Sequence, residues 1–188
     1  MSHQIHEKKM KRLFLILAVL VFATASFAQT ANIPVSEKTQ KICFQRVIPT
    51  EGTNTEVFNR IAGEWLRSVY KNPMAVVTGN DGSKITGKHI IQLDCEEEVK
   101  TKCPAVNYKF TVEVREGRIR YTITDFTLDT SKTTKGLFPI ERWLDKEDPL
   151  YDSSWGNYLD QIAAFAEAWG ANLEAKLKPE QKVEEEDW

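Results

Sequence analysis

Apolar and polar side chains alternate from Tyr108 to Asp125, in the stretch YKFTVEVREGRIRYTITD. A period of two is typical of β-strands that bury one face and leave the other in water. Glu116 and Gly117 separate the two alternating halves. We expect them to form a tight turn, because glycine reaches positive φ without steric cost. With that turn at the tip, the predicted register pairs five couples across the hairpin: Val114 with Ile119, Val112 with Tyr121, Phe110 with Ile123, Glu113 with Arg120, and Thr111 with Thr122.

Two other stretches place apolar residues three and four positions apart, which is typical of amphipathic helices. The first begins at Thr53, which has the capping-box spacing to Glu56, and is stopped by Asn72-Pro73. The second begins at Ser153 or Ser154, either of which can cap it. Its apolar stripe lasts for about six turns, so we expect this helix to cover the apolar face of a sheet.

Shorter apolar runs predict three further strands, at residues 41–49, 74–78 and 84–94. Residues 136–152 read as an irregular segment whose apolar side chains pin it against the body. The elements then follow in the order β-α-β-β-β-β-α. The predicted fold class is therefore α+β with two layers: a mostly antiparallel sheet of about five strands, and two helices packed on one of its faces.

The two ends of the chain are predicted to lie outside this single domain, which we place at residues 41–178. Residues 1–28 have the order of a secretory signal peptide: basic residues, an apolar run, and small residues before a cut ahead of Gln29. The apolar run is short for a membrane span, which needs about 20 residues, and an uncleaved anchor is the alternative. We expect an exported protein, periplasmic or secreted, without a membrane span in the mature chain. Residues 29–40 are predicted to be a flexible leader and residues 179–188 an acidic disordered tail.

The charge of the chain bears on its partners. The complete sequence has a net charge of −2, and the mature chain would carry −5, because the signal peptide holds four basic residues and one acidic residue. A net acidic exported domain is a poor partner for nucleic acid or for an anionic membrane. We therefore expect an envelope protein or surface component as the partner.

All three cysteines lie in the predicted mature chain, which would fold in an oxidising compartment. Cys95 and Cys103 flank a charged stretch between two predicted strands, and we expect a disulfide that closes this loop. The alternative is three buried thiols. Cys43 is expected to be a small core residue, because unpaired cysteine is among the most buried residue types.

The sequence has none of the common catalytic or cofactor motifs: no GxSxG, no P-loop, no GxGxxG, and no metal-binding spacing of His and Cys. His89 is the only histidine of the mature chain, and a lone histidine in a strand is more often structural than catalytic. Cys43 as a nucleophile would need a nearby base. Asp125 could pair with Arg118 or Arg120, or cap the following turn. We predict that the protein is not an enzyme and holds neither a cofactor nor a metal.

Three stretches of the chain resemble the DUF4468 family, which comprises small exported proteins of Bacteroidetes. They are EVREGRIRYTITDF (Glu113–Phe126), FPIERW (Phe138–Trp143) and GSKITGKHIIQL (Gly82–Leu93). The resemblance implies a TBP-like fold. The family has no established activity, so the resemblance implies no catalytic residue, and a TBP-like shape does not imply DNA binding.

The solvated face of the hairpin is the predicted binding site. It would present Lys109, Glu113, Arg115, Arg118 and Arg120, and its arginines could grip a carboxylate or phosphate of a partner. The alternative is a solubilising surface with a cross-strand ion pair. We therefore expect a non-enzymatic interaction module of the cell envelope, for which residues 136–152 offer a second contact surface.

A different hypothesis is a carrier with an apolar pocket for a small ligand, placed between the C-terminal helix and the sheet. Four aromatic side chains would line this pocket: Tyr121, Trp155, Tyr158 and Trp169. The alternative is that these side chains simply fill the core.

Overall fold

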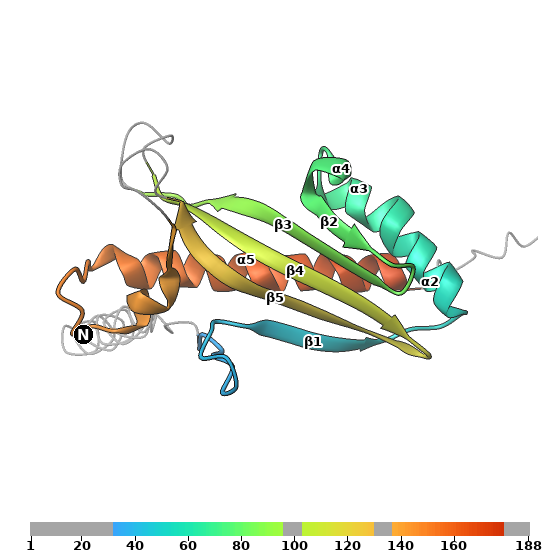
Figure 1. The fold of residues 1–188 in the computed structure, drawn as a ribbon, viewed down its shortest axis with the longest axis horizontal. Coiled ribbons are helices and arrows are strands. Elements are labelled where there is room, and N and C mark those ends of the chain that lie inside the picture. Colours follow the sequence, from blue (N-terminus) through green and yellow to red (C-terminus); the bar gives the residue numbers. More distant parts are fainter. Residues whose placement is uncertain (1–31, 96–102, 130–136, 179–188) are drawn as a thin grey trace, which may run out of the picture. The chain divides into compact units, whose positions relative to one another are not determined.

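A computed structural model of the protein describes residues 32–95, 103–129 and 137–178 (Figure 1). The predicted signal peptide at residues 1–28 and the predicted tail at residues 179–188 lie outside the described residues. The described elements are, in order, β1 (Phe44–Pro49), α2 (Asn54–Arg60), the π-helix η1 (Ile61–Trp65), α3 (Leu66–Val69), α4 (Pro73–Val76), β2 (Val77–Asn80), β3 (Lys84–Gln92), β4 (Ala105–Arg115), β5 (Arg118–Asp129), β6 (Leu137–Pro139), the 3₁₀ helix η3 (Ile140–Leu144) and α5 (Ser154–Leu177).

The described strands form one antiparallel sheet with the order β1-β5-β4-β3-β2, and β6 pairs with the C-terminal end of β5. The β4–β5 hairpin has the predicted register, with Val114 opposite Ile119 and Glu113 opposite Arg120. Gly117 at its tip has a φ of 68°, as the predicted turn requires. The hairpin deduced from the alternating pattern is therefore confirmed.

Helical segments cover one face of this sheet (Figure 1). Trp169 of α5 packs against the rings of Tyr121 and Phe110, at centroid distances of 5.3 and 5.5 Å. The continuous run of α2, η1 and α3 contributes Trp65, whose ring lies 4.7 Å from that of Trp169. The predicted two-layer α+β fold is confirmed. We call the opposite side of the sheet, to which the polar positions of β4 and β5 point, the open face.

The first helix begins as the sequence predicts. The side chain of Thr53 accepts a hydrogen bond from the backbone N–H of Glu56, and the Glu56 carboxylate accepts one from the N–H of Thr53. This reciprocal capping box satisfies two backbone donors that the helix itself leaves unpaired. No helix in the described parts of the chain has both the length and the apolar character that crossing a membrane requires.

The strand predicted at residues 74–78 begins later than expected. Pro73–Val76 forms a helical turn instead, and β2 runs from Val77 to Asn80. Proline suits the first turn of a helix, because its fixed φ is helical and its missing N–H would have no partner there. The proline therefore starts a new helical turn besides ending the preceding helix.

The described part of the predicted flexible leader, residues 32–40, is ordered. Cys43 donates its backbone N–H to the carbonyl of Pro34 at 2.9 Å, and Ser36 donates to Lys41 at 2.8 Å. Ile33 packs against the hydrophobic core. These contacts fold the chain back on itself just before β1, so the domain starts several residues earlier than predicted.

The segment at residues 136–152 is more regular than predicted. It contains β6, a strand that the sequence did not reveal, and η3. Ile140 and Trp143 are buried, so this segment is pinned against the body as expected. Because β6 pairs with β5, the sheet has six strands within the described residues, where the sequence predicted about five.

The predicted disulfide between Cys95 and Cys103 is present. Cys43, however, is not a core residue, because it is only half-buried and its neighbour Ile42 fills the core position. Partial burial raises the pKa of the Cys43 thiol, while a hydrogen bond with Thr124 opposes that change. Alternation along the strand thus puts Ile42 inside and Cys43 on the open face.

Candidate functional site

The predicted binding residues do lie on the open face, and four of the five lie together at the hairpin tip. They line a depression with a volume of about 130 Å³, which we call the arginine hollow: Val47, Glu113, Arg115, Arg118 and Arg120. The fifth predicted residue, Lys109, does not line the hollow. The apolar member, Val47, belongs to β1 and is 51% exposed.

The fold brings Val47 to the hollow through the pairing of β1 with β5, which places Val47 opposite Arg120. The pairing of β3 with β4 likewise places Lys84 opposite Glu113. Sequence reasoning missed both residues, because each pairing joins strands whose contact has no local signal in the chain. Only the two strands of the hairpin could be aligned from the sequence.

Positive charge exceeds negative charge in the arginine hollow. Glu113 is its one carboxylate, and it already accepts a hydrogen bond from Arg120 and lies 3.3 Å from the ammonium group of Lys84. The hydrogen bond from Arg120, together with that from Lys84, lowers the pKa of Glu113, so this carboxylate stays ionised at neutral pH. One acid is therefore shared between two cations.

Arg115 and Arg118 lie directly opposite each other across the hairpin. Like charges in this position destabilise a strand pair. Within the described residues, neither arginine has a carboxylate at salt-bridge distance. The hollow therefore presents two guanidinium groups whose charge the protein itself does not neutralise there.

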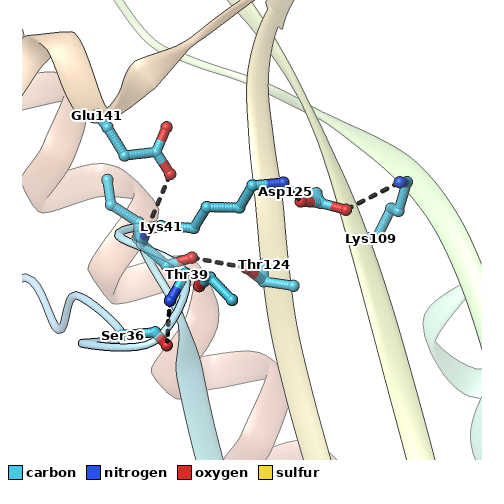
Figure 2. Close-up of polar contacts among 8 residues, drawn as sticks. Ser36, Thr39, Lys41, Lys109, Thr124, Asp125 and Glu141 are labelled. Atoms are coloured by element: carbon cyan, nitrogen blue, oxygen red, sulfur yellow. Dashed lines mark hydrogen bonds and ion pairs between the residues drawn. The ribbon is translucent and has the colours of Figure 1, made fainter.

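Lys109 takes part in a separate cluster around Asp125 (Figure 2). Its ammonium group donates to Asp125 at 2.8 Å, and Lys41 donates to the other carboxylate oxygen. Hydrogen bonds from Lys109 and then Lys41 lower the pKa of Asp125. Asp125 therefore pairs with two lysines and not with Arg118 or Arg120, the pairing that the sequence had left open.

A β-bulge in β5 explains why Asp125 meets the two lysines and not the arginines of the hairpin. The register between β4 and β5 shifts between Asn107 and Lys109, and Asp125 has a φ of 55°. The extra residue turns Asp125 toward the open face and places Phe126, which is 1% exposed, in the core. The apolar positions had shown this break of phase, because Phe126 follows Ile123 by three residues where the alternation requires two.

The cluster around Asp125 fastens the N-terminal turn to the sheet (Figure 2). Glu141 accepts the backbone N–H of Ile42 at 2.8 Å, and Thr124 donates its hydroxyl to the carbonyl of Ile42 at 2.9 Å. Lys41, the residue before Ile42, forms an ion pair with Asp125. Every charged group drawn here has a partner within the protein, so we assign this cluster a structural role.

The other sequence candidates do not assemble into a catalytic site. His89 is exposed, and its ring lies 5.2 Å from that of Tyr70, an aromatic contact without a carboxylate partner in the described residues. Cys43 lies beside Thr124 rather than beside a base. Among the described residues, no group of three or more His, Cys, Asp or Glu side chains is placed to hold a metal.

The aromatic side chains proposed to line a ligand pocket divide into two clusters. Trp169 and Tyr121 belong to the centre of the core, where the indole N–H of Trp169 donates to Tyr70 at 2.8 Å. Trp155 and Tyr158 instead surround Trp143, at 6.2 and 5.7 Å between ring centroids. These residues pack against one another, as the core alternative predicts.

Several solved structures match this chain, and two of them show its fold. The crystal structure of a TBP-like protein from Parabacteroides distasonis matches with a TM-score of 0.58 at 16% sequence identity, over 77% of this chain and 96% of that chain. That of a DUF4468 family protein from Bacteroides ovatus matches with a TM-score of 0.57 at 16% identity, over 80% of this chain and 93% of the other. At such low identity the likeness shows the fold alone. No protein of curated function matches the sequence.

The family model described as a domain of unknown function, DUF4468, with TBP-like fold matches residues 44–129. This segment contains β1 to β5, and with them the arginine hollow. Two of the three resembling stretches fall within it, whereas Phe138–Trp143 lies beyond its end. The expected resemblance to the family and the TBP-like fold are thus confirmed, and residues 44–129 of this chain match the DUF4468 domain model.

Proposed function

We propose that this protein is an exported, non-enzymatic interaction module that binds an anionic group of an envelope protein or surface component in the arginine hollow. The observation that carries the proposal is the facing pair of Arg115 and Arg118, which has no carboxylate partner in the described residues. Export is the sequence-based part of the proposal, and the disulfide between Cys95 and Cys103 is compatible with it.

The chemistry of the hollow suits a carboxylate or phosphate. A guanidinium group is planar and offers parallel N–H donors, which match two oxygens of such an anion. An anion held between Arg115 and Arg118 would also remove their mutual repulsion. The exposed side chain of Val47 adds an apolar contact at the rim.

The size of the hollow favours part of a macromolecule over a free ligand. Pockets for small molecules usually enclose roughly 300–1,000 Å³, whereas this one encloses about 130 Å³. Such a volume accommodates a carboxylate or phosphate head group but leaves the rest of the ligand outside. The partner would therefore spread over the surrounding open face.

The test is affinity capture by the tagged mature chain from the envelope of its own cells, followed by isothermal titration of the purified partner. We compare a hollow variant, with Arg115, Arg118 and Arg120 changed to serine, with a control variant that loses as much charge elsewhere. Arg67, Lys71 and Lys146 suit the control, because all three are exposed and lie outside the hollow.

The hollow variant is expected to lose about tenfold or more in affinity, because charged hydrogen bonds contribute about 1.5–3 kcal/mol each. The control variant should bind like the parent chain. Thermal unfolding should stay within a few degrees of the parent, since only one exposed ion pair, Arg120 with Glu113, is lost. Equal binding by the hollow variant and the parent would refute the proposal.

A further inference from the structure

We propose that the partner is a protein that adds an extended segment, as a further strand, along the free edge of β1. An acidic side chain of this segment would enter the arginine hollow, and an apolar neighbour would lie on the helix side of the sheet. The acidic contact rests on the proposed function, whereas the backbone of β1 supports the strand pairing independently of it.

β1 lies at one margin of the sheet (Figure 1). Among the described residues it pairs with β5 on one side, and no strand of the sheet lies along its other side. Gln45, Arg46 and Val47, in the middle of β1, are all exposed. An edge of this kind presents backbone N–H and C=O groups that another chain can pair with.

A hydrogen bond at the end of β1 shows which backbone groups point outward. The N–H of Thr50 donates to the carbonyl of Gly117, beside the start of β5, at 3.0 Å. The carbonyl of Pro49 belongs to the same planar trans peptide and therefore points away from β5. Backbone groups alternate along an antiparallel strand, so the N–H and C=O groups of Gln45 and Val47 also point away from β5.

The beginning of β1 agrees with this direction. Cys43, two residues before Gln45, donates its backbone N–H to the carbonyl of Pro34 at 2.9 Å, on the outer side of the strand. The outer side thus has a backbone partner as far as Cys43 and none, within the described residues, at Gln45 and Val47. Pro49 limits the free stretch, because it offers a carbonyl but no N–H.

Two depressions flank this free edge, one on each side of the sheet. The arginine hollow lies on the open face and includes Val47. On the helix side, a depression of about 310 Å³ is lined by Ile48 and Pro49 of β1 and by Leu177 of α5. Side chains of an added strand would alternate between the two faces. Two consecutive residues of the partner could therefore enter the two depressions.

The depression on the open face favours an acidic side chain. Arg118 lies opposite Pro49 and Arg120 opposite Val47, so both arginines are one strand away from β1. Neighbouring strands lie about 4.8 Å apart, which places an added strand roughly 10 Å from β5. An extended arginine and an extended glutamate side chain together span that distance. A carboxylate of the added strand would then meet the guanidinium groups of the hollow.

The depression on the helix side favours an apolar side chain. Ile48 and Leu177, which line it, are both buried core residues. Glu174 and Lys178 also line it, and their charged groups lie 3.8 Å apart, so their opposite charges largely cancel. An apolar residue placed there would lose water-exposed surface against the core. The recognised segment is thus an acidic residue directly beside an apolar one, in extended conformation.

A second copy of this chain suits the edge less well. Pairing of β1 with the β1 of another copy would continue the sheet and bring two arginine hollows onto one open face. Their like charges would repel each other. The charge of the hollow therefore favours an acidic segment of a different protein.

Peptide selection supplies the probe for the test. Random linear peptides displayed on phage are selected on the immobilised mature chain, and the enriched peptides are then synthesised. We expect the enriched sequences to share an acidic residue directly beside an apolar residue. A selection that yields no binding peptide, or only peptides without acidic residues, would overturn the proposal.

Amide hydrogen exchange measured by NMR locates the bound peptide. In the free protein the N–H groups of Gln45 and Val47 should exchange fast, whereas those of Arg46 and Ile48, which point toward β5, should exchange slowly. The peptide should slow exchange at Gln45 and Val47 about tenfold or more and leave Arg46 and Ile48 unchanged. Unaltered exchange at Gln45 and Val47 in the complex would rule out the added strand.

Two changes to the backbone test the pairing itself. Val47→Pro removes an N–H that points away from β5, so the domain should keep its fold, but peptide binding should weaken about tenfold or more. Methylation of every second backbone nitrogen of the peptide gives two matched forms. The form methylated on the amides that face β1 should not bind, and the other form should bind like the parent peptide. Equal binding by both forms, or full binding by Val47→Pro, contradicts the strand pairing.

The hollow variant separates this failure from that of the proposed function. If the hollow variant loses binding and Val47→Pro does not, the anion site stands and the added strand is refuted, as expected for a glycan or lipid partner. If the hollow variant binds the peptide like the parent, both the acidic contact and the proposed function are refuted. Light scattering supplies the last check, because a parent dimer that Val47→Pro dissociates would assign the edge to a second copy and overturn the proposal.

Discussion

Replacing Gly170 by alanine tests how closely α5 packs against the sheet. A Cβ atom at this position would lie 2.1 Å from Oη of Tyr121 and 2.7 Å from its Cζ. Both distances are far inside van der Waals contact, so the ring of Tyr121 or the helix must move. Tyr121 is only 3% exposed, and its ring packs 5.3 Å from that of Trp169, so it has little room to retreat.

Two opposing effects set the magnitude. Alanine favours a helix over glycine by about 1 kcal/mol. Overpacking of a filled core costs about 1–3 kcal/mol. The clash with the nearly buried ring of Tyr121 places Gly170→Ala in the upper part of that range, so we expect a net loss of about 1–2 kcal/mol in the free energy of unfolding. For a domain of this size the melting temperature should fall by about 2–8 °C.

Urea unfolding measures the effect, and the same helix supplies the control. Gly156 also lies in α5, but a Cβ there would meet no atom within 4 Å. Gly156→Ala should therefore leave stability unchanged or raise it by up to about 1 kcal/mol. Adding Tyr121→Phe to Gly170→Ala removes the nearest clashing atom and should restore part of the loss. If Gly170→Ala proves as stable as Gly156→Ala, the close packing of α5 on β5 is refuted.

Three further predictions concern the charged clusters and the disulfide. Asp125→Asn should lower the free energy of unfolding in urea by less than about 1 kcal/mol, because exposed ion pairs contribute little and asparagine tolerates positive φ. Asp125→Val should lower it clearly more, because a β-branched residue does not tolerate the φ of 55°. Equal losses for the two variants would contradict the positive φ at this position. The pKa values of Asp125 and Glu113 are lower in the folded protein than in the unfolded chain. The stability that these two carboxylates add is therefore complete above about pH 4, and it is lost as the pH falls through their folded pKa values. Urea unfolding at pH 7 and pH 3 should show this loss, and it should shrink when both residues are amides. Changing Cys95 and Cys103 together to serine should lower the free energy of unfolding by about 2.5 kcal/mol, because the bridge no longer closes a loop of about nine residues in the unfolded chain. If reducing conditions leave the unfolding of the parent chain unchanged, the bridge is refuted.

The hairpin and the arginine hollow could be predicted together, for one physical reason. A tight turn at Gly117 fixes the register, and the register fixes which side chains share a face. Glu113 and Arg120 had to meet once that turn was placed, and Arg115 and Arg118 had to face each other beside them. Local sequence was sufficient, because every pairing involved lies within a few residues of the turn.

Contacts between strands that are distant in the chain could not be predicted in the same way. Val47 enters the hollow because β1 pairs with β5, more than 60 residues away, and no residue of β1 specifies that partner. The side of the sheet on which Cys43 lies could not be predicted for the same reason. Either face of β1 could have been the buried one, and only the pairing of β1 with β5 decides between them. The bulge at Asp125 was different, because the step from Ile123 to Phe126 is visible in the sequence and was overlooked.

Backbone strain and the proposed binding site lie apart in this domain. A residue with positive φ and two ion pairs, such as Asp125, often marks a functional site. Here the strain has a structural explanation, because the bulge brings Phe126 into the core and the two lysines neutralise the carboxylate. The facing arginines Arg115 and Arg118 show the opposite combination: a regular backbone and charges that the fold leaves unbalanced. A threonine at either position would pair across the strands without repulsion. The proposed function would account for this cost, because an anion held between Arg115 and Arg118 would remove their mutual repulsion.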